Sequence, residues 1–205
     1  MKRINLLILP VLALLFLAAC ESGGNFRVVN QTTHPVYVTL GDEGEIVIPG
    51  GAEHSFDVAT ANQHILNPDV SVEVPVRLLG ETYQLLDEDN NPTDTTRVVI
   101  HAGETTNAFI DPNRAGFKVV NNSSQGVAQA TLFKHNFIGV VGTYELGPIA
   151  PGRFSFLPVE YASGSNNFYY KATIRMEDDT SYEYGGPTNI LDVDQQFLIT
   201  LNDPE

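Results

Sequence analysis

From Phe26 onward the chain carries one sequence pattern twice, and this constrains the fold more than any other feature. The segment FRVVN at 26–30 recurs as FKVVN at 117–121, 91 positions later, and a short polar stretch follows each copy. IPG at 48–50 has its counterpart in APG at 150–152, and further matches keep the same order. Pro-Gly alone is a weak turn pattern, but colinear matches indicate a tandem duplication. One long irregular sandwich is the alternative.

The apolar pattern within each copy is that of short β-strands. Brief alternations are interrupted by Gly, Pro, Asn and Asp, and no long 3.6-residue periodicity occurs. The clearest predicted strand covers 70–79, and the apolar run at 137–146 predicts another. The sequence therefore predicts an all-β chain with two tandem antiparallel β-sandwich domains of immunoglobulin-like architecture, without the Cys and Trp framework of true immunoglobulin domains.

The repeat also sets the expected domain boundaries. Domain 1 is predicted over 26–112 and domain 2 over 117–205, joined by a linker at 113–116. Because the linker is short, we expect the sandwiches to lie end to end with limited hinge motion. Asn30 and Asn121 end the repeated strand, and such residues commonly bond nearby backbone to close a turn.

Two predicted strands carry specific expectations. Pro75 cannot donate to a strand ladder, so the strand at 70–79 should lie at a sheet edge or bulge there. In the second copy, Tyr170, Ala172, Ile174 and Met176 alternate with polar residues. That face is predicted to fill the core of domain 2.

The first twenty residues form a different kind of segment. Lys2 and Arg3 precede a mostly apolar run of about 14 residues that ends on small residues before Cys20, the only cysteine. This order is typical of a secretory signal peptide, so residues 1–19 are excluded from the fold. The run is shorter than the roughly 20 residues of a membrane-spanning helix. An uncleaved transmembrane anchor is the alternative.

The tetrad Leu17-Ala18-Ala19-Cys20 resembles the lipobox of bacterial lipoproteins. The resemblance covers the leader alone, and it implies cleavage before Cys20 and acylation of that cysteine, with palmitate among the expected acyl groups. Several acyl chains would make a firm membrane anchor. Glu21 stands where aspartate is associated with inner-membrane retention, which favours the outer membrane; the face of the membrane stays open. Residues 20–25 are expected to form the lipidated cysteine and its tether.

Charge and cysteine content exclude some classes of function. The net charge is −14, and loss of residues 1–19 leaves nine basic residues against 25 acidic ones, a net charge of −16. Such a surface repels phosphate, so nucleic-acid binding is disfavoured. A chain with one cysteine forms no internal disulfide, so stability must come from packed apolar area.

The acidic stretch at 87–94 is the weak candidate for a metal site. Asp87, Asp89 and Asn91 have the alternate spacing that begins a calcium-binding EF-hand loop, with Asp94 close by. Pro92 replaces the glycine that such a loop needs for its sharp turn. An exposed acidic turn is therefore the preferred interpretation. The five histidines lack local zinc-site spacing, and no cofactor is expected.

Tyrosines of the second copy are the weak candidates for ligand binding. These candidates are Tyr161, Tyr169 and Tyr182, of which Tyr161 and Tyr169 are expected to be exposed. Tyrosine suits recognition surfaces; core packing is the competing role. The lack of tryptophan argues against a typical carbohydrate-binding platform. No catalytic residue is assigned, because the chain has no Gly-x-Ser-x-Gly elbow and Cys20 is consumed by the anchor.

These observations predict a membrane-anchored envelope lipoprotein that acts as a non-catalytic binding or scaffold module. Its expected partners are the membrane, through the lipid anchor, and another envelope or extracellular protein. A carbohydrate- or metal-binding accessory protein of the envelope is the alternative, and an enzyme of unidentified class comes third. The sequence leaves the oligomeric state open.

Overall fold

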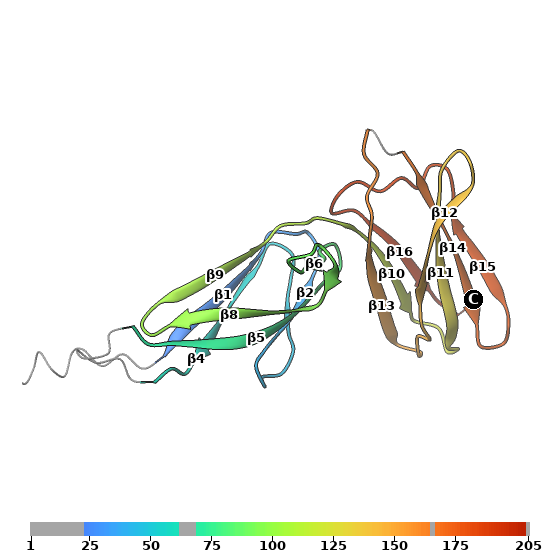
Figure 1. The fold of residues 1–205 in the computed structure, drawn as a ribbon. Coiled ribbons are helices and arrows are strands. Elements are labelled where there is room, and N and C mark those ends of the chain that lie inside the picture. Colours follow the sequence, from blue (N-terminus) through green and yellow to red (C-terminus); the bar gives the residue numbers. More distant parts are fainter. Residues whose placement is uncertain (1–22, 62–68, 165–166, 204–205) are drawn as a thin grey trace, which may run out of the picture.

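The structure is a computed structural model that describes residues 23–61, 69–164 and 167–203. Regular secondary structure in these ranges is entirely β-strand, arranged as two sandwiches in series (Figure 1). The predicted fold class is therefore confirmed. The predicted signal peptide and Cys20 lie outside the described residues. Within the described part of the chain, no helix has the length and apolar character needed to cross a membrane.

Domain 1 is defined here by the sheets that the first nine strands form. The strands are β1 (Gly24–Asn30), β2 (Val36–Leu40), β3 (Ile46–Ile48), β4 (Glu53–Val58), β5 (Ser71–Gly80), β6 (Leu85–Leu86), β7 (Pro92–Thr93), β8 (Thr95–His101) and β9 (Thr105–Ile110). One sheet has the order β4-β1-β9 and the other β3-β2-β5-β8, while β6 and β7 form a small separate ribbon.

Domain 2 repeats this plan with seven strands. They are β10 (Ala115–Asn121), β11 (Val127–His135), β12 (Val140–Leu146), β13 (Arg153–Val159), β14 (Tyr169–Met176), β15 (Ser181–Gly185) and β16 (Gln196–Leu201). The order is β13-β10-β16 in one sheet and β12-β11-β14-β15 in the other. β1 begins at Gly24, inside the predicted tether at 20–25, and the connection between β9 and β10 covers 111–114, two residues earlier than the predicted linker at 113–116.

The first and last strands of each domain are parallel neighbours. β1 pairs with β9 and β10 pairs with β16 in parallel, whereas the other strand pairs are antiparallel. The predicted antiparallel arrangement thus fails at one pair per domain. The last strand crosses from the opposite sheet and joins the first strand in the same direction, so the chain enters a domain at one end and leaves at the other.

Each domain has its own core, built from the inward faces predicted by alternation. In β14, Tyr170 and Ile174 are fully buried and Ala172 and Met176 nearly so. In β5, Val76 and Leu78 face inward in the same way. The buried apolar side chains separate into one cluster per domain. The two sandwiches are therefore stabilised by separate cores.

The structure corrects the predicted position of Pro75. β5 lies between β2 and β8 and is not an edge strand. The ladder with β2 ends at the Leu40–Val76 pair, and Pro75 O then accepts a hydrogen bond from the N–H of Gly41 (2.8 Å). The nitrogen of Pro75 faces the same side, past the end of β2. The missing N–H therefore breaks no ladder bond.

The paired asparagines close equivalent turns in the two domains. Asn30 Nδ2 donates to the carbonyls of His34 (2.8 Å) and Ile48 (3.0 Å), and its Oδ1 accepts from Thr32 N. Asn121 Nδ2 donates to Gln125 O (2.7 Å) and Ile149 O (3.0 Å). Both asparagines are buried. The predicted structural role of these residues is confirmed.

Candidate functional site

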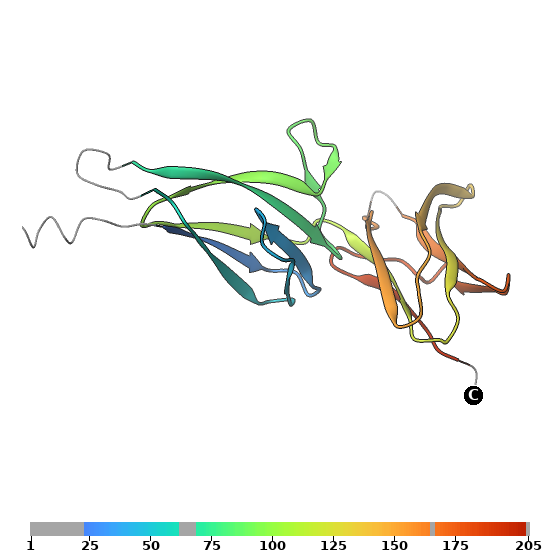
Figure 2. The same ribbon diagram turned by 90° about the horizontal axis from the view of Figure 1, so that it is seen from below.

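The two domains meet through one end of domain 1 and the outer face of the β13-β10-β16 sheet of domain 2 (Figures 1 and 2). The ring of Tyr37 in β2 stacks on Phe156 of β13, with ring centroids 5.1 Å apart, and also lies near Phe154. A Cβ at Gly116 would lie 2.7 Å from Glu81 O, so the backbones approach closely here. The expected end-to-end arrangement is wrong, because the end of one sandwich packs on a sheet face of the other.

A buried carboxylate lies at the centre of this contact. The side chain of Glu81 is 1% exposed, and it accepts hydrogen bonds from Tyr37 Oη (2.8 Å), Lys118 Nζ (2.6 Å) and Gln196 Nε2 (2.6 Å). Burial raises the pKa of Tyr37, and its hydrogen bond to Glu81 raises it further, so the phenol stays a neutral donor. Three donors from three strands compensate the charge, as a buried carboxylate requires.

Asp194 makes a second set of contacts across the domains. Its carboxylate accepts from Thr33 N (2.8 Å) and Thr82 Oγ1 (2.6 Å), both in domain 1. Its own N–H donates to Arg114 O (2.9 Å), which ties the loop before β16 to the linker. Arg114 N in turn donates to Thr82 O (3.0 Å). The domains are therefore held at several points, and rotation about the linker would break them together.

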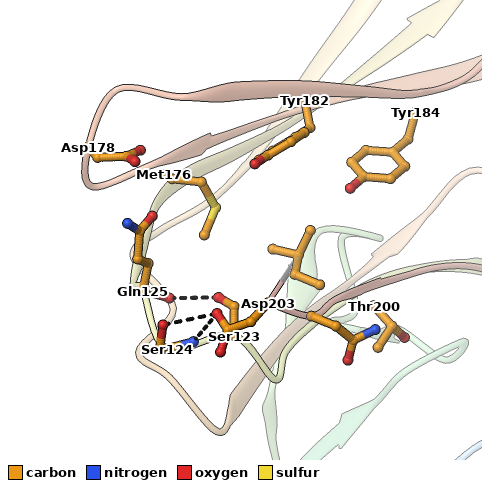
Figure 3. Close-up of a pocket in the computed structure, with 11 residues that line it drawn as sticks. Ser123, Ser124, Gln125, Met176, Asp178, Tyr182, Tyr184, Thr200 and Asp203 are labelled. Carbon is orange, nitrogen blue, oxygen red and sulfur yellow. Dashed lines mark hydrogen bonds between the residues drawn. The ribbon is translucent and has the colours of Figure 1, made fainter. Parts of the chain in front are cut away.

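An open cleft of about 710 Å³ lies in domain 2, at the end of β10 and β16 away from the linker (Figure 3). Tyr182 and Tyr184 of β15 line one side, and the turn at 123–125 and Asp203 line the other. The buried Met176 adds apolar surface between them. β15 and β16 are edge strands of opposite sheets, so the cleft occupies the open side of the sandwich.

The cleft offers aromatic faces, hydroxyl groups and carboxylates. Asp203 Oδ1 accepts from Ser124 N (2.8 Å) and Ser124 Oγ (2.9 Å). A hydrogen bond from the backbone of Thr180 lowers the pKa of Asp178, which keeps this carboxylate ionised. Among the described residues that line the cleft, none is Lys, Arg or His. The site therefore suits a neutral or cationic polar ligand and disfavours an anion.

The structure separates the three predicted ligand-binding tyrosines. Tyr182 lines the cleft and is 46% exposed. Tyr169 instead stacks on His135, with centroids 5.2 Å apart, and Tyr161 lies exposed in the segment after β13. Neither of these two lines the cleft. The sequence thus identified one residue of the cleft and missed its neighbour Tyr184. The available signal was the spacing of Tyr182 and Tyr184, because residues two positions apart in a strand lie on the same face.

The acidic loop at 87–94 uses its side chains to close a turn. Asp87 Oδ1 accepts from the N–H groups of Asp89 (2.9 Å) and Asn91 (2.7 Å), and these bonds lower the pKa of Asp87. Asp94 is paired with Arg77 (2.9 Å). Within the described ranges, no group of three or more His, Cys, Asp or Glu residues could hold a metal ion. The geometry is that of an exposed acidic turn.

Sequence reasoning also missed an exposed apolar hairpin tip. The predicted strand at 137–146 begins only at Val140, because Asn136 to Gly139 form a turn. Phe137 is 96% exposed and Ile138 78%, and Val140 and Val141 are about half exposed. We call these four residues the apolar fingertip. The available signal for a turn was the sequence Asn136-Phe137-Ile138-Gly139, in which Asn and Gly flank two residues.

No protein-family model matches the chain, and no curated protein is significantly similar to it. Several solved structures are similar in outline. The tip fimbrial protein Mfa3 from Porphyromonas gingivalis is 9% identical, with a TM-score of 0.37 over 89% of this chain and 96% of that one. A candidate cell adhesion protein from Bacteroides ovatus is 10% identical, with a TM-score of 0.35 over 90% and 92% of the two chains.

The TIE protein of Bacillus anthracis is 10% identical, with a TM-score of 0.31 over 89% of this chain. This chain spans 34% of the length of that protein. At such low scores these likenesses add nothing to the strand order, which rests on the pairing within the chain itself.

Proposed function

We propose that the protein is a lipid-anchored, non-catalytic binding module of the bacterial cell envelope. The observation that carries this proposal is the buried contact at Glu81, which joins the two sandwiches into one rigid arm. Binding surfaces of this kind are commonly placed on loops and edges of a rigid scaffold. Here such a surface is available in domain 2, at the cleft and at the apolar fingertip.

The path of the chain supports a separation between anchor and binding surface. β1 starts at Gly24 and runs to Asn30, whose side chain bonds His34 O. His34 Nε2 in turn lies 3.1 Å from Asp194 O of domain 2. The start of the first strand is therefore at the end of domain 1 away from domain 2. An acylated Cys20 a few residues earlier would hold domain 2 away from the membrane surface.

Lipid anchoring through Cys20 has a direct test. In a bacterial host fed a palmitate analogue, the full chain is expected to incorporate label, and its N-terminal peptide should carry an acyl mass on Cys20. The variant Cys20→Ala should lose the label, because it lacks the acylated sulfur, while Ser22→Ala should keep it. A mature N-terminus without acyl mass, or an intact leader in the native chain, would refute the anchor.

Carbohydrate binding is the second candidate, and the cleft of domain 2 favours it. Tyr182 and Tyr184 offer ring faces for stacking, and the carboxylates of Asp178 and Asp203 can accept hydrogen bonds from sugar hydroxyls. Clefts that combine apolar surface with a few convergent polar groups are the usual form of small-ligand sites. The absence of cations among the described lining residues points to neutral glycans.

A glycan array, with a pulldown from intact membranes beside it, separates the two candidates. If the cleft binds glycans, Tyr182→Ala should weaken a hit by on the order of tenfold, about 1.4 kcal/mol, because a stacking face is lost. Tyr161→Ala is the matched control, since Tyr161 is similarly exposed outside the cleft. Capture of a protein partner without any glycan hit supports the binding or scaffold role alone. Equal glycan binding by Tyr182→Ala argues against the cleft.

A further inference from the structure

The end of domain 2 away from the linker is equivalent to the end of domain 1 that docks on domain 2. β5 pairs with β2 as β14 pairs with β11, and a glutamate directly follows each: Glu81 after β5 and Glu177 after β14. Glu81 N donates to Pro35 O (3.3 Å), and Glu177 N donates to Gly126 O (3.0 Å). Both carbonyls follow the turn that a buried asparagine closes. Glu177 is therefore the counterpart of Glu81.

The end of domain 1 shows what such a surface binds. The Glu81 side chain is 1% exposed, because domain 2 covers it, and Lys118 Nζ and Gln196 Nε2 donate to its carboxylate (both 2.6 Å). The next residue, Thr82, is fully buried and donates to Asp194 of domain 2 (2.6 Å). A sandwich end of this kind thus docks on a protein face that presents a cation to its glutamate.

The equivalent surface of domain 2 is uncovered. Glu177 and its neighbour Asp178 are both exposed, in contrast to the buried pair at the end of domain 1. Among the described residues, neither carboxylate forms an ion pair. A Cβ at Gly126 would collide with the carboxylate of Glu177, so this glycine leaves the space in which the carboxylate lies against the turn. The surface therefore holds two carboxylates that lack a cation.

The charge and shape of this end favour a basic side chain as the missing group. Asp178 stands where domain 1 has Thr82, so the end of domain 2 carries one more negative charge than its counterpart. Tyr182 and Tyr184 line the adjoining cleft, where their rings can hold the apolar stem or the charge of a lysine or arginine (Figure 3). The described lining of this cleft has no Lys, Arg or His. Complementary charge has to come from a partner.

From these observations we infer that the end of domain 2 at 122–126 and 177–180 docks on a basic face of another envelope protein, whose lysine or arginine is bound by Glu177 and Asp178. This inference rests on the proposed function and adds the surface and the chemistry of the partner. A second copy of this chain fits less well. Its counterpart of Lys118 is Arg27, which is already paired with Glu53 and lies on β1 close to the expected anchor.

Site-specific photo-crosslinking in the native host tests the surface. The full chain carries benzoylphenylalanine at Gln125, an exposed residue of the turn, and should form an adduct with one other protein. Glu177→Lys should reduce this adduct at least tenfold, because like charges then face each other. Glu145→Lys, a matched change at an exposed glutamate of β12, should leave it unchanged. Melting curves verify that each variant folds.

Charge exchange completes the test. Mass spectrometry of the adduct identifies the basic residues of the partner next to the cross-link. Replacing the contacting lysine or arginine with glutamate should abolish the adduct with the native chain and restore it with Glu177→Lys. If Glu177→Lys leaves the adduct intact, or if the adduct is with lipid or with a second copy of this chain, the inference is overturned.

A second probe position separates this inference from the proposed function. Benzoylphenylalanine at Tyr161, an exposed residue outside the cleft, reports contacts made elsewhere on domain 2. Protein adducts at Tyr161 without any at Gln125 would overturn the docking surface and leave the binding function standing. The lack of a protein adduct at both positions would count against the surface and the binding function together.

Discussion

Replacing Ile174 with aspartate is expected to unfold domain 2. Ile174 is fully buried in the domain 2 core, on the inward face of β14. A carboxylate there has no partner and no water, and burial of an unpaired charge is among the largest single-residue penalties. We expect a loss on the order of 5 kcal/mol, which equals the whole stability of many domains. Calorimetry should show the transition of domain 2 disappear.

The control for this change lies on the same strand. Lys171 is exposed on β14, so Lys171→Asp should shift stability by no more than about 0.5 kcal/mol. Domain 1 should keep its own transition in Ile174→Asp, because its buried cluster is separate from that of domain 2. A wild-type melting profile for Ile174→Asp would contradict the core assignment.

Glu81→Ala is expected to uncouple the two domains. The change leaves Tyr37 Oη, Lys118 Nζ and Gln196 Nε2 without their shared acceptor. Removing one partner of a buried ion pair typically costs about 3–5 kcal/mol, because the other charge stays buried. The Lys118 side chain is 16% exposed and regains some water, so we expect about 3 kcal/mol. Denaturant unfolding measures the loss, and small-angle scattering should show a broader range of domain orientations.

Two further substitutions separate charge from hydrogen bonding at this position. Glu81→Gln keeps a carbonyl acceptor for Tyr37 but removes the charge opposite Lys118, so its loss should be smaller. Glu183→Ala alters an exposed glutamate on β15 and should leave the domain orientation unchanged. If Glu81→Ala unfolds at the native midpoint with the native scattering curve, the contact does not set the geometry of the arm.

Sequence patterns predicted the strands well where apolar and polar residues alternate along the chain. The alternation at 70–79 and in β14 matches their inward faces, because side chains of a strand point alternately to core and solvent. The order of the repeated segments predicted two sandwiches, and both asparagines occupy equivalent turns. Strand alternation depends on residues close together in the sequence, and the repeat is visible in the order of the matching segments.

Features that depend on distant residues could not be predicted in this way. Glu81 is one of 25 acidic residues, and its role follows only from donors at positions 37, 118 and 196, which the fold brings together. The parallel pairing of β1 with β9 likewise has no local pattern. The cleft is lined by strands from both sheets of domain 2, and Tyr182 lies opposite the buried Ile174 of β14, on the inward face of its sheet.

The parallel pairing of the first and last strands has a mechanical consequence. Force that enters domain 1 at Gly24 and leaves at Ile110 pulls β1 and β9 in opposite directions along their length. The ladder between them is then loaded in shear, so its hydrogen bonds resist together instead of opening one after another. β10 and β16 share this geometry between Ala115 and Leu201. Each sandwich is thus built to carry tension along the chain without peeling apart.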